Sequence, residues 1–218
     1  MNHYKLIKIS LSVLFLIFFQ FSVHAQLADR IELTEDHQLL GLGTQYILKS
    51  EILQEDRPFI ISLPKGYKES KTNYPVLYLL DGLAYIKHVV GTVELLTESG
   101  VIPPMIIVGI ESLDRARDYT PSYAGKDGYA GPGTDIPQSG GAPKFLQFLE
   151  GELIPYVESN FRTHPYRLLE GHSFGGLFST YALMNKPELF NAFIIQAPAL
   201  WWNKEEMTAQ AKDFFNSN

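Results

Sequence analysis

The chain has 218 residues, 45% of them apolar, which is enough for one globular domain with a sizeable core. It has no cysteine, so disulfides, thiolate metal sites and cysteine-linked lipid anchors are excluded. The formal net charge is −6 and there is no basic run, which argues against a nucleic-acid partner.

The first 25 residues have the pattern of a secretory signal peptide. Lys5 and Lys8 precede an apolar run over residues 9–19, and Ala25 is the small residue of a cleavage site. The run is too short to span a bilayer as a helix. We therefore expect cleavage after Ala25, no integral membrane segment in the mature protein, and a secreted or periplasmic location. The mature chain would keep 18 − 2 basic residues against 24 acidic ones, a net charge of −8.

Residues 26–218 have the pattern of one α/β domain. Short apolar runs, typical of strands buried on both faces, alternate with longer stretches whose apolar residues recur at helical spacing. This alternation predicts a mostly parallel sheet with helices on both faces, and two opening strands joined by a tight polar connection predict an antiparallel edge. Residues 26–42 are a linker or the lead into a first strand. In chain order, the predicted strands lie at 45–52, 57–63, 75–80, 105–110, 168–170 and 192–196, and the predicted helices at 86–96, 145–161, about 174–185 and 204–215.

Two segments depart from this alternation. Residues 114–142 form a long stretch rich in glycine, proline and serine, and a loop of that length inside a compact domain is usually functional or a lid. Its Arg115, Arg117 and Asp118 either steer an anionic substrate or brace the loop through ion pairs. Pro155 lies inside the helix predicted after this loop, where it predicts a kink or a break.

The sequence Gly171-His172-Ser173-Phe174-Gly175 lies between a predicted strand and a predicted helix. In that setting G-x-S-x-G is the nucleophile elbow of α/β-hydrolases, a sharp turn that exposes its serine above the sheet. Gly171 and Gly175 leave room where a Cβ would clash, and the following helix directs the positive end of its dipole toward the serine oxygen. Ser173 is therefore the candidate nucleophile. The alternative is a glycine-rich strand-to-helix turn with an incidental serine.

Several segments together resemble the putative-esterase family of α/β-hydrolases, which includes esterase D, enterochelin esterases and mycolyltransferases. The matching segments follow one another in unbroken order over roughly residues 45–205, so as a set they are far more specific than the elbow alone. They are YPVLYLLDG at 74–82, IIVGI at 106–110, DRARDYTP at 114–121, GGAPKF at 140–145, ELIPY at 152–156, GHSFGG at 171–176 and PALWW at 198–202.

The resemblance implies a three-layer α/β-hydrolase sandwich and a serine carboxylic-ester hydrolase that acts through an acyl-serine intermediate at Ser173. It implies that the backbone N–H groups of Leu83 and Phe174 form the oxyanion hole. It also implies that Trp201 and Trp202 lie close to the acyl or alcohol pocket. The expected partner is a small-molecule ester, siderophore-like or aromatic, and the resemblance implies neither a cofactor nor a metal ion.

The general base that would activate Ser173 does not follow it in the sequence. In this fold the triad runs serine, acid, histidine along the chain, but none of the 45 residues after Ser173 is a histidine. Of the earlier histidines, His172 should point away from the serine, His164 lies at the opposite end of the elbow strand, and His88 belongs to a helix surface. We therefore expect a C-terminally incomplete chain, with the triad acid and histidine beyond residue 218 and little activity from these residues alone.

Two alternatives to the hydrolase remain at this stage. A non-catalytic binding protein could keep the α/β-hydrolase fold and lose the base, which the missing histidine favours and the intact elbow and oxyanion turn oppose. An acyltransferase would use the same Ser173 and would differ in whether water is kept away from the acyl-enzyme.

Overall fold

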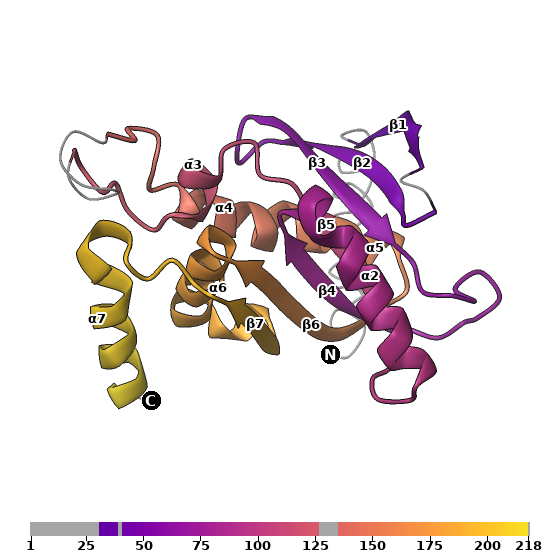
Figure 1. Cartoon of the computed structure of the whole chain (residues 1–218). Coiled ribbons are helices and arrows are strands. Elements are labelled where there is room, and N and C mark those ends of the chain that lie inside the picture. The colour runs from indigo at the N-terminus through magenta and orange to yellow at the C-terminus, as the bar shows by residue number, and fades with distance from the viewer. Residues whose placement is uncertain (1–30, 39–40, 127–134, 218) are drawn as a thin grey trace, which may run out of the picture.

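The computed structural model describes residues 31–38, 41–126 and 135–217 (Figure 1). The expected signal peptide lies outside these residues. The described chain forms one sheet with helices on both faces, which confirms the α/β fold predicted from the sequence. Within the described ranges, no helix combines the length and the apolar character that crossing a membrane requires.

Seven strands form the sheet, in the order β1-β2-β3-β5-β4-β6-β7. The strands β5, β4, β6 and β7 run parallel to one another, whereas β1, β2 and β3 pair antiparallel. The predicted antiparallel opening pair is confirmed as β2 and β3, and β1 adds a third strand in the stretch that precedes them. The bounds are β1 Ile31–Gln38, β2 Thr44–Ser50, β3 Glu55–Ser62, β4 Tyr74–Leu80, β5 Ile106–Ile110, β6 Thr163–His172 and β7 Ala192–Gln196.

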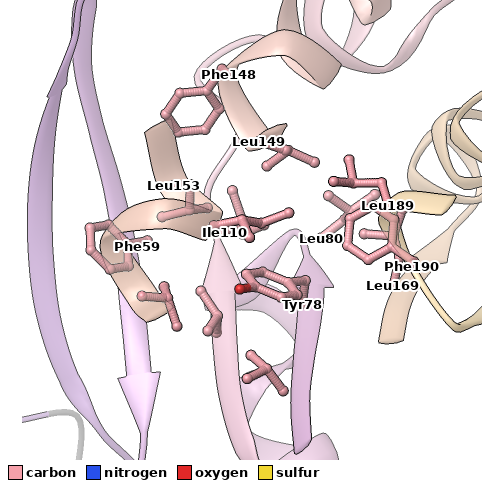
Figure 2. Packing of buried hydrophobic residues seen from close by; sticks show 14 of the residues in the cluster. Phe59, Tyr78, Leu80, Ile110, Phe148, Leu149, Leu153, Leu169, Leu189 and Phe190 are labelled. Atoms are coloured by element: carbon pink, nitrogen blue, oxygen red, sulfur yellow. The ribbon is translucent and has the colours of Figure 1, made fainter. Parts of the chain in front are cut away.

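Two apolar cores lie on opposite faces of this sheet. Alternate side chains of β4 supply both, because successive residues of a strand point to opposite faces. Tyr78 and Leu80 belong to the larger core, with residues of α4 (Ala142–Phe148), α5 (Ile154–Asn160) and α6 (Phe174–Asn185). Figure 2 shows both side chains in this core with Phe148 of α4. Leu77 and Leu79 pack on the other face against α2 (Gly82–Glu98). Burial on both faces explains why β4 and β5 are apolar throughout, as predicted.

The helix predicted over 145–161 is interrupted as its proline suggested. A π-helical segment, η1 (Leu149–Leu153), separates α4 from α5, immediately before Pro155. Proline has no N–H to donate, so it removes a helical hydrogen bond at this point, and the neighbouring turn is π-helical. Within η1, the buried Glu152 accepts hydrogen bonds from the Ser50 hydroxyl and from backbone N–H groups in the β2–β3 turn. The interruption therefore joins this helix to the antiparallel half of the sheet.

Further helical segments lie in the connections after β5, before β7 and after β7. The long segment after β5 contains a short helix, α3 (Arg115–Tyr119), and the 3₁₀ turn η2 (Pro187–Leu189) precedes β7. The last helix, α7 (Trp202–Ser217), begins with a left-handed turn in which three residues have positive φ. The carboxyl ends of parallel strands meet at one edge of a sheet, where open α/β sheets bind ligands. The residues directly after β4, β5, β6 and β7 are Asp81, Glu111, Ser173 and Ala197.

Candidate active site

Ser173 lies in the sharp turn between β6 and α6. Its φ of 58° and ψ of −114° are unusual for a residue with a side chain, so neighbouring contacts must hold them. The Ser173 N–H donates to the Gln196 carbonyl at 3.1 Å, and the Ala199 N–H donates to the Ser173 carbonyl at 3.0 Å. The end of β7 and the loop after it therefore hold the serine backbone in place.

Close backbone contact explains one glycine of the elbow better than the other. A Cβ added to Gly171 would lie 2.3 Å from the carbonyl oxygen of Gly175, so any larger residue would force β6 and α6 apart. A Cβ on Gly175 would meet the Leu80 Cβ at 3.4 Å, which is close to ordinary contact. Position 171 therefore requires glycine, because a side chain there would clash with the backbone of residue 175. Position 175 has room for a Cβ, and its backbone is what comes close to Gly171.

The turn between β4 and α2 holds the other predicted oxyanion donor. Asp81 has a φ of 54°, and its carbonyl accepts hydrogen bonds from the Ala84 and Tyr85 N–H groups. The first N–H groups of a helix have no helical acceptor, and that of Leu83 donates to the carboxylate of Glu111. Sequence reasoning missed Glu111. An acidic residue directly after a buried central strand was the signal that could have found it.

A bidentate ion pair fixes the side chain of Asp81. The Arg115 guanidinium donates to its two carboxylate oxygens at 2.8 and 3.1 Å. The Asp81 N–H donates to the Tyr119 hydroxyl at 3.3 Å, and burial together with the Asp81 charge raises the pKa of that hydroxyl well above its usual range. The Arg115 guanidinium also lies over the ring of Phe174, 5.7 Å from its centre. Of the two roles predicted for Arg115, the structure shows bracing, and the segment it braces is the turn between β4 and α2.

A buried network of charges anchors α3 to β3. Arg57 on β3 is fully buried, and its guanidinium donates to the Asp118 carboxylate at 2.7 Å. Arg117 donates to the other Asp118 oxygen at 2.8 Å and to Glu55 at 2.7 Å, and Glu55 also pairs with Arg57. Because α3 carries Arg115, this network sets the position of the group that holds Asp81.

Replacement of Asp118 by asparagine should destabilise the protein strongly. It leaves the buried Arg57 with less compensating charge, and breaking a buried pair on one side costs about 3–5 kcal/mol of unfolding free energy. Urea unfolding followed by circular dichroism would measure the change. Glu98→Gln is the matched control, since the Lys65–Glu98 pair is 3.7 Å long with both side chains largely exposed. Equal effects of the two substitutions would contradict a stabilising role for the network.

Comparison with known proteins identifies the family. Residues 50–217 match the family model described as "Putative esterase". The chain belongs to this esterase family. It is 34% identical over 175 residues to the ferri-bacillibactin esterase BesA of Bacillus subtilis, covering 74% of this chain and 60% of that protein. It is 30% identical over 182 residues to the siderophore triacetylfusarinine C esterase of Aspergillus fumigatus, covering 74% of this chain and 59% of that protein.

Among solved structures, an IroE-like serine hydrolase from Shewanella oneidensis aligns with a TM-score of 0.71 and 36% identity, over 79% of this chain and 55% of that one. The chain therefore spans about 60% of the length of these two curated relatives.

Three histidines lie within residues 41–126 and 135–217, and none of them is hydrogen-bonded to Ser173. The His172 Nδ1 lies 3.0 Å from the Tyr85 hydroxyl on α2, and the His88 ring packs edge-on against Tyr85. The His164 Nδ1 accepts from the N–H of Tyr166, near the amino end of β6. Within residues 41–126 and 135–217, no hydrogen bond joins Ser173 to an imidazole.

A cavity of about 250 Å³ lies between α2 and the carboxyl ends of β4, β6 and β7. Glu170, 8% exposed, lines it and accepts a hydrogen bond from the Gln196 amide at 2.7 Å. Burial raises the pKa of Glu170, against the lowering effects of His88 and of that hydrogen bond. His172 and Tyr85 also line the cavity, so their contact links the elbow to the first turn of α2. In the part of the chain that the structure describes, no group of His, Asp or Glu is arranged to hold a metal ion.

The two tryptophans predicted near the pocket have different environments. Trp202 is fully buried with Leu177 and Met207, and its indole N–H donates to the Ser122 carbonyl at 3.1 Å. Trp201 is 50% exposed and lies 5.8 Å, centre to centre, from the ring of Phe174, the residue after Ser173. Trp201 is therefore open to solvent beside Phe174, whereas Trp202 is a packing residue that holds the segment around Ser122.

Binding of a substrate analogue should change the tryptophan fluorescence through Trp201. The chain has only two tryptophans, so Trp201→Phe should abolish the ligand-induced change. Trp202→Phe should retain that change and instead lower the unfolding free energy, by about 1–3 kcal/mol for the loss of a buried ring and its hydrogen bond. Titration with an aromatic phosphonate, followed by emission spectra, would measure both. A response that depends on Trp202 alone would contradict this placement.

Proposed function

We propose that the protein is a serine carboxylic-ester hydrolase that acts through an acyl-Ser173 intermediate. The observation that carries the proposal is the strained turn at Ser173, with φ at 58°, at the same sheet edge as the turn that contains Leu83, in a chain of the esterase family. A conformation that costs about 1–3 kcal/mol persists where the surrounding structure holds it, and such strain concentrates at functional sites.

In the proposed reaction the Ser173 oxygen attacks the ester carbonyl and loses its proton to a general base. A bond forms between Oγ and the carbonyl carbon, and the carbonyl oxygen becomes an oxyanion that the Leu83 and Phe174 N–H groups stabilise. Collapse of this intermediate breaks the bond to the alcohol, which leaves with the proton from the base. Water then attacks the acyl-serine by the same steps, which releases the acid and restores Ser173.

The base that we propose is a histidine beyond residue 218, held by an acid that also lies there. Two findings support it. None of the imidazoles discussed above is hydrogen-bonded to Ser173, and the chain spans 60% and 59% of the lengths of its two curated relatives. The 218 residues alone should therefore hydrolyse esters feebly, since the oxyanion hole without its base keeps only a small part of the catalysis.

Siderophore esters are the substrate class that we propose. The relatives described above are named for the hydrolysis of ferri-bacillibactin and of triacetylfusarinine C. On this chain, the partly exposed Arg115 guanidinium and the ring of Trp201 both lie against Phe174, beside the nucleophile. Aromatic faces beside the nucleophile suit an aromatic acyl group better than an aliphatic one, because aromatic rings stack on one another.

Hydrolysis of a catecholate trilactone siderophore by the full-length protein tests this proposal. We expect ring opening to linear products, followed by liquid chromatography and mass spectrometry, with kcat/KM above that for p-nitrophenyl acetate. Tight binding without hydrolysis would favour the non-catalytic binding protein. Transfer of the acyl group to an added alcohol in preference to water would favour the acyltransferase.

We also propose that the protein is exported, from the lysines, apolar run and Ala25 of its first 25 residues. N-terminal sequencing of the mature protein should begin at Gln26. A membrane-bound form that keeps Met1 would contradict export by cleavage.

A further inference from the structure

The Glu111 carboxylate is hydrogen-bonded to the Leu83 N–H, a group that the proposed reaction needs. Glu111 directly follows β5, whose last residue, Ile110, pairs with Leu80 at the end of β4. This pairing brings Glu111 beside the turn that starts α2. There its carboxylate accepts the hydrogen bond of the Leu83 N–H. The expected oxyanion donor therefore already has an anionic acceptor in this structure.

The charges around Glu111 come from three elements. From the turn after β4, the Asp81 carboxylate faces it, and that charge is shared with Arg115. From β3, the Arg57 guanidinium donates to the backbone carbonyl of Glu111 at 3.0 Å. From α3, the Tyr119 hydroxyl lies close enough for the charge of Glu111 to contribute to its raised pKa. Burial and Asp81 raise the pKa of Glu111 and outweigh the lowering effects of Arg57 and the Leu83 N–H. Glu111 therefore gives up its charge at a higher pH than an exposed glutamate does.

We propose that Glu111 is an internal competitor of the substrate oxyanion, with its carboxylate bound to the Leu83 N–H until a reacting ester displaces it. The inference rests on the proposed function, because a competitor matters only if an oxyanion forms at Ser173. No covalent bond changes in this step. One hydrogen bond to a carboxylate is exchanged for one to the oxyanion, while the Glu111 side chain turns away from the donor.

The competition should depend on pH in a defined direction. A charged acceptor binds an N–H group roughly twice as strongly as a neutral one. The ionised Glu111 therefore competes well above its pKa, and the neutral form competes weakly below it. Because the folded protein has a raised pKa for Glu111, relief of the competition begins at a higher pH than for an ordinary glutamate. The rate penalty should grow as pH rises through the titration of Glu111.

Reaction of the full-length enzyme with a fluorophosphonate tests this inference. Glu111→Gln keeps the shape and removes the charge, so it should react about tenfold faster than the wild type above the titration of Glu111. The ratio of the two rates cancels the pH dependence of the general base, and it should fall toward about one below that titration. Glu94→Gln, an exposed glutamate on α2, is the matched control and should follow the wild type at every pH. A Glu111→Gln variant that is no faster at any pH would overturn the inference.

A second measurement reports the contact without turnover. In the Ser173→Ala full-length protein, the amide proton of Leu83 should shift as Glu111 titrates, and Glu111→Gln should abolish that shift. The same spectra show whether each variant is folded. If the wild type reacts with the probe but the Leu83 amide proton does not shift as Glu111 titrates, the competitor role is wrong and the proposed esterase function is unaffected. If every variant is inert while the spectra show folded protein, the proposed function fails and the competition falls with it.

Discussion

Replacement of Ser173 by alanine should abolish both fluorophosphonate labelling and ester turnover by the full-length protein. Alanine has the size to keep the elbow backbone, and it removes only the oxygen that we propose as the nucleophile. In serine hydrolases the loss of this oxygen costs on the order of 10⁶-fold in kcat, and the residual rate comes from substrate binding and the oxyanion hole.

The matched control for that substitution is Ser99→Ala. Ser99 is an exposed serine at the far end of α2, and its loss should leave labelling and turnover unchanged. Labelling that survives in Ser173→Ala would mean that another residue is the nucleophile. Turnover that survives without labelling would point to a reaction without an acyl-serine.

Replacement of Gly82 by alanine should disrupt the turn between β4 and α2 and destabilise the fold. A Cβ at Gly82 would lie 2.4 Å from the carbonyl carbon and 2.6 Å from the Cα of Gly109 on β5. Both atoms belong to backbone in the centre of the sheet, so the first turn of α2 must move and carry the Leu83 N–H with it. We expect a loss of about 3 kcal/mol in unfolding free energy from overpacking, and a fall of about 100-fold in kcat from the misplaced donor.

Gly91 offers the same substitution on the same helix without the crowding. It is exposed, and a Cβ there would have no neighbouring atom within 4 Å. Gly91→Ala should therefore raise the unfolding free energy by up to about 1 kcal/mol, since alanine is the better helix former. Urea unfolding and kcat measured on both variants would separate the two effects. A tolerated Gly82→Ala would contradict the close contact between α2 and β5.

Local sequence patterns predicted the parallel half of the sheet and the elbow. These patterns depend on residues that are near in the chain or on the immediate environment of a single residue. The apolar runs of β4 and β5 are one example, and the glycines around Ser173 are another. Burial on both faces requires a continuous apolar strand, and the tight approach of β6 to α6 requires a glycine at position 171.

The long-range contacts that hold the candidate site in place could not be predicted from local sequence. Arg57 and Asp118 are 61 residues apart, and nothing in either local sequence indicates that they meet. The contact between Glu111 and the Leu83 N–H depends on the parallel pairing of β5 with β4, in a sheet where β5 lies between β3 and β4 and so departs from the chain order. Pro155 predicted a disturbed helix, but that the disturbance would direct Glu152 toward the β2–β3 turn depends on tertiary structure.

Mass spectrometry of the acyl-enzyme tests the central claim most directly. The full-length protein would be mixed with p-nitrophenyl acetate, quenched in acid within the first turnovers and digested, and the peptide that contains Ser173 would be sequenced. We expect one acetyl group on the Ser173 oxygen, formed together with a burst of nitrophenol and absent from Ser173→Ala. Steady hydrolysis with an unmodified Ser173, or an acetyl group on another residue, would contradict it.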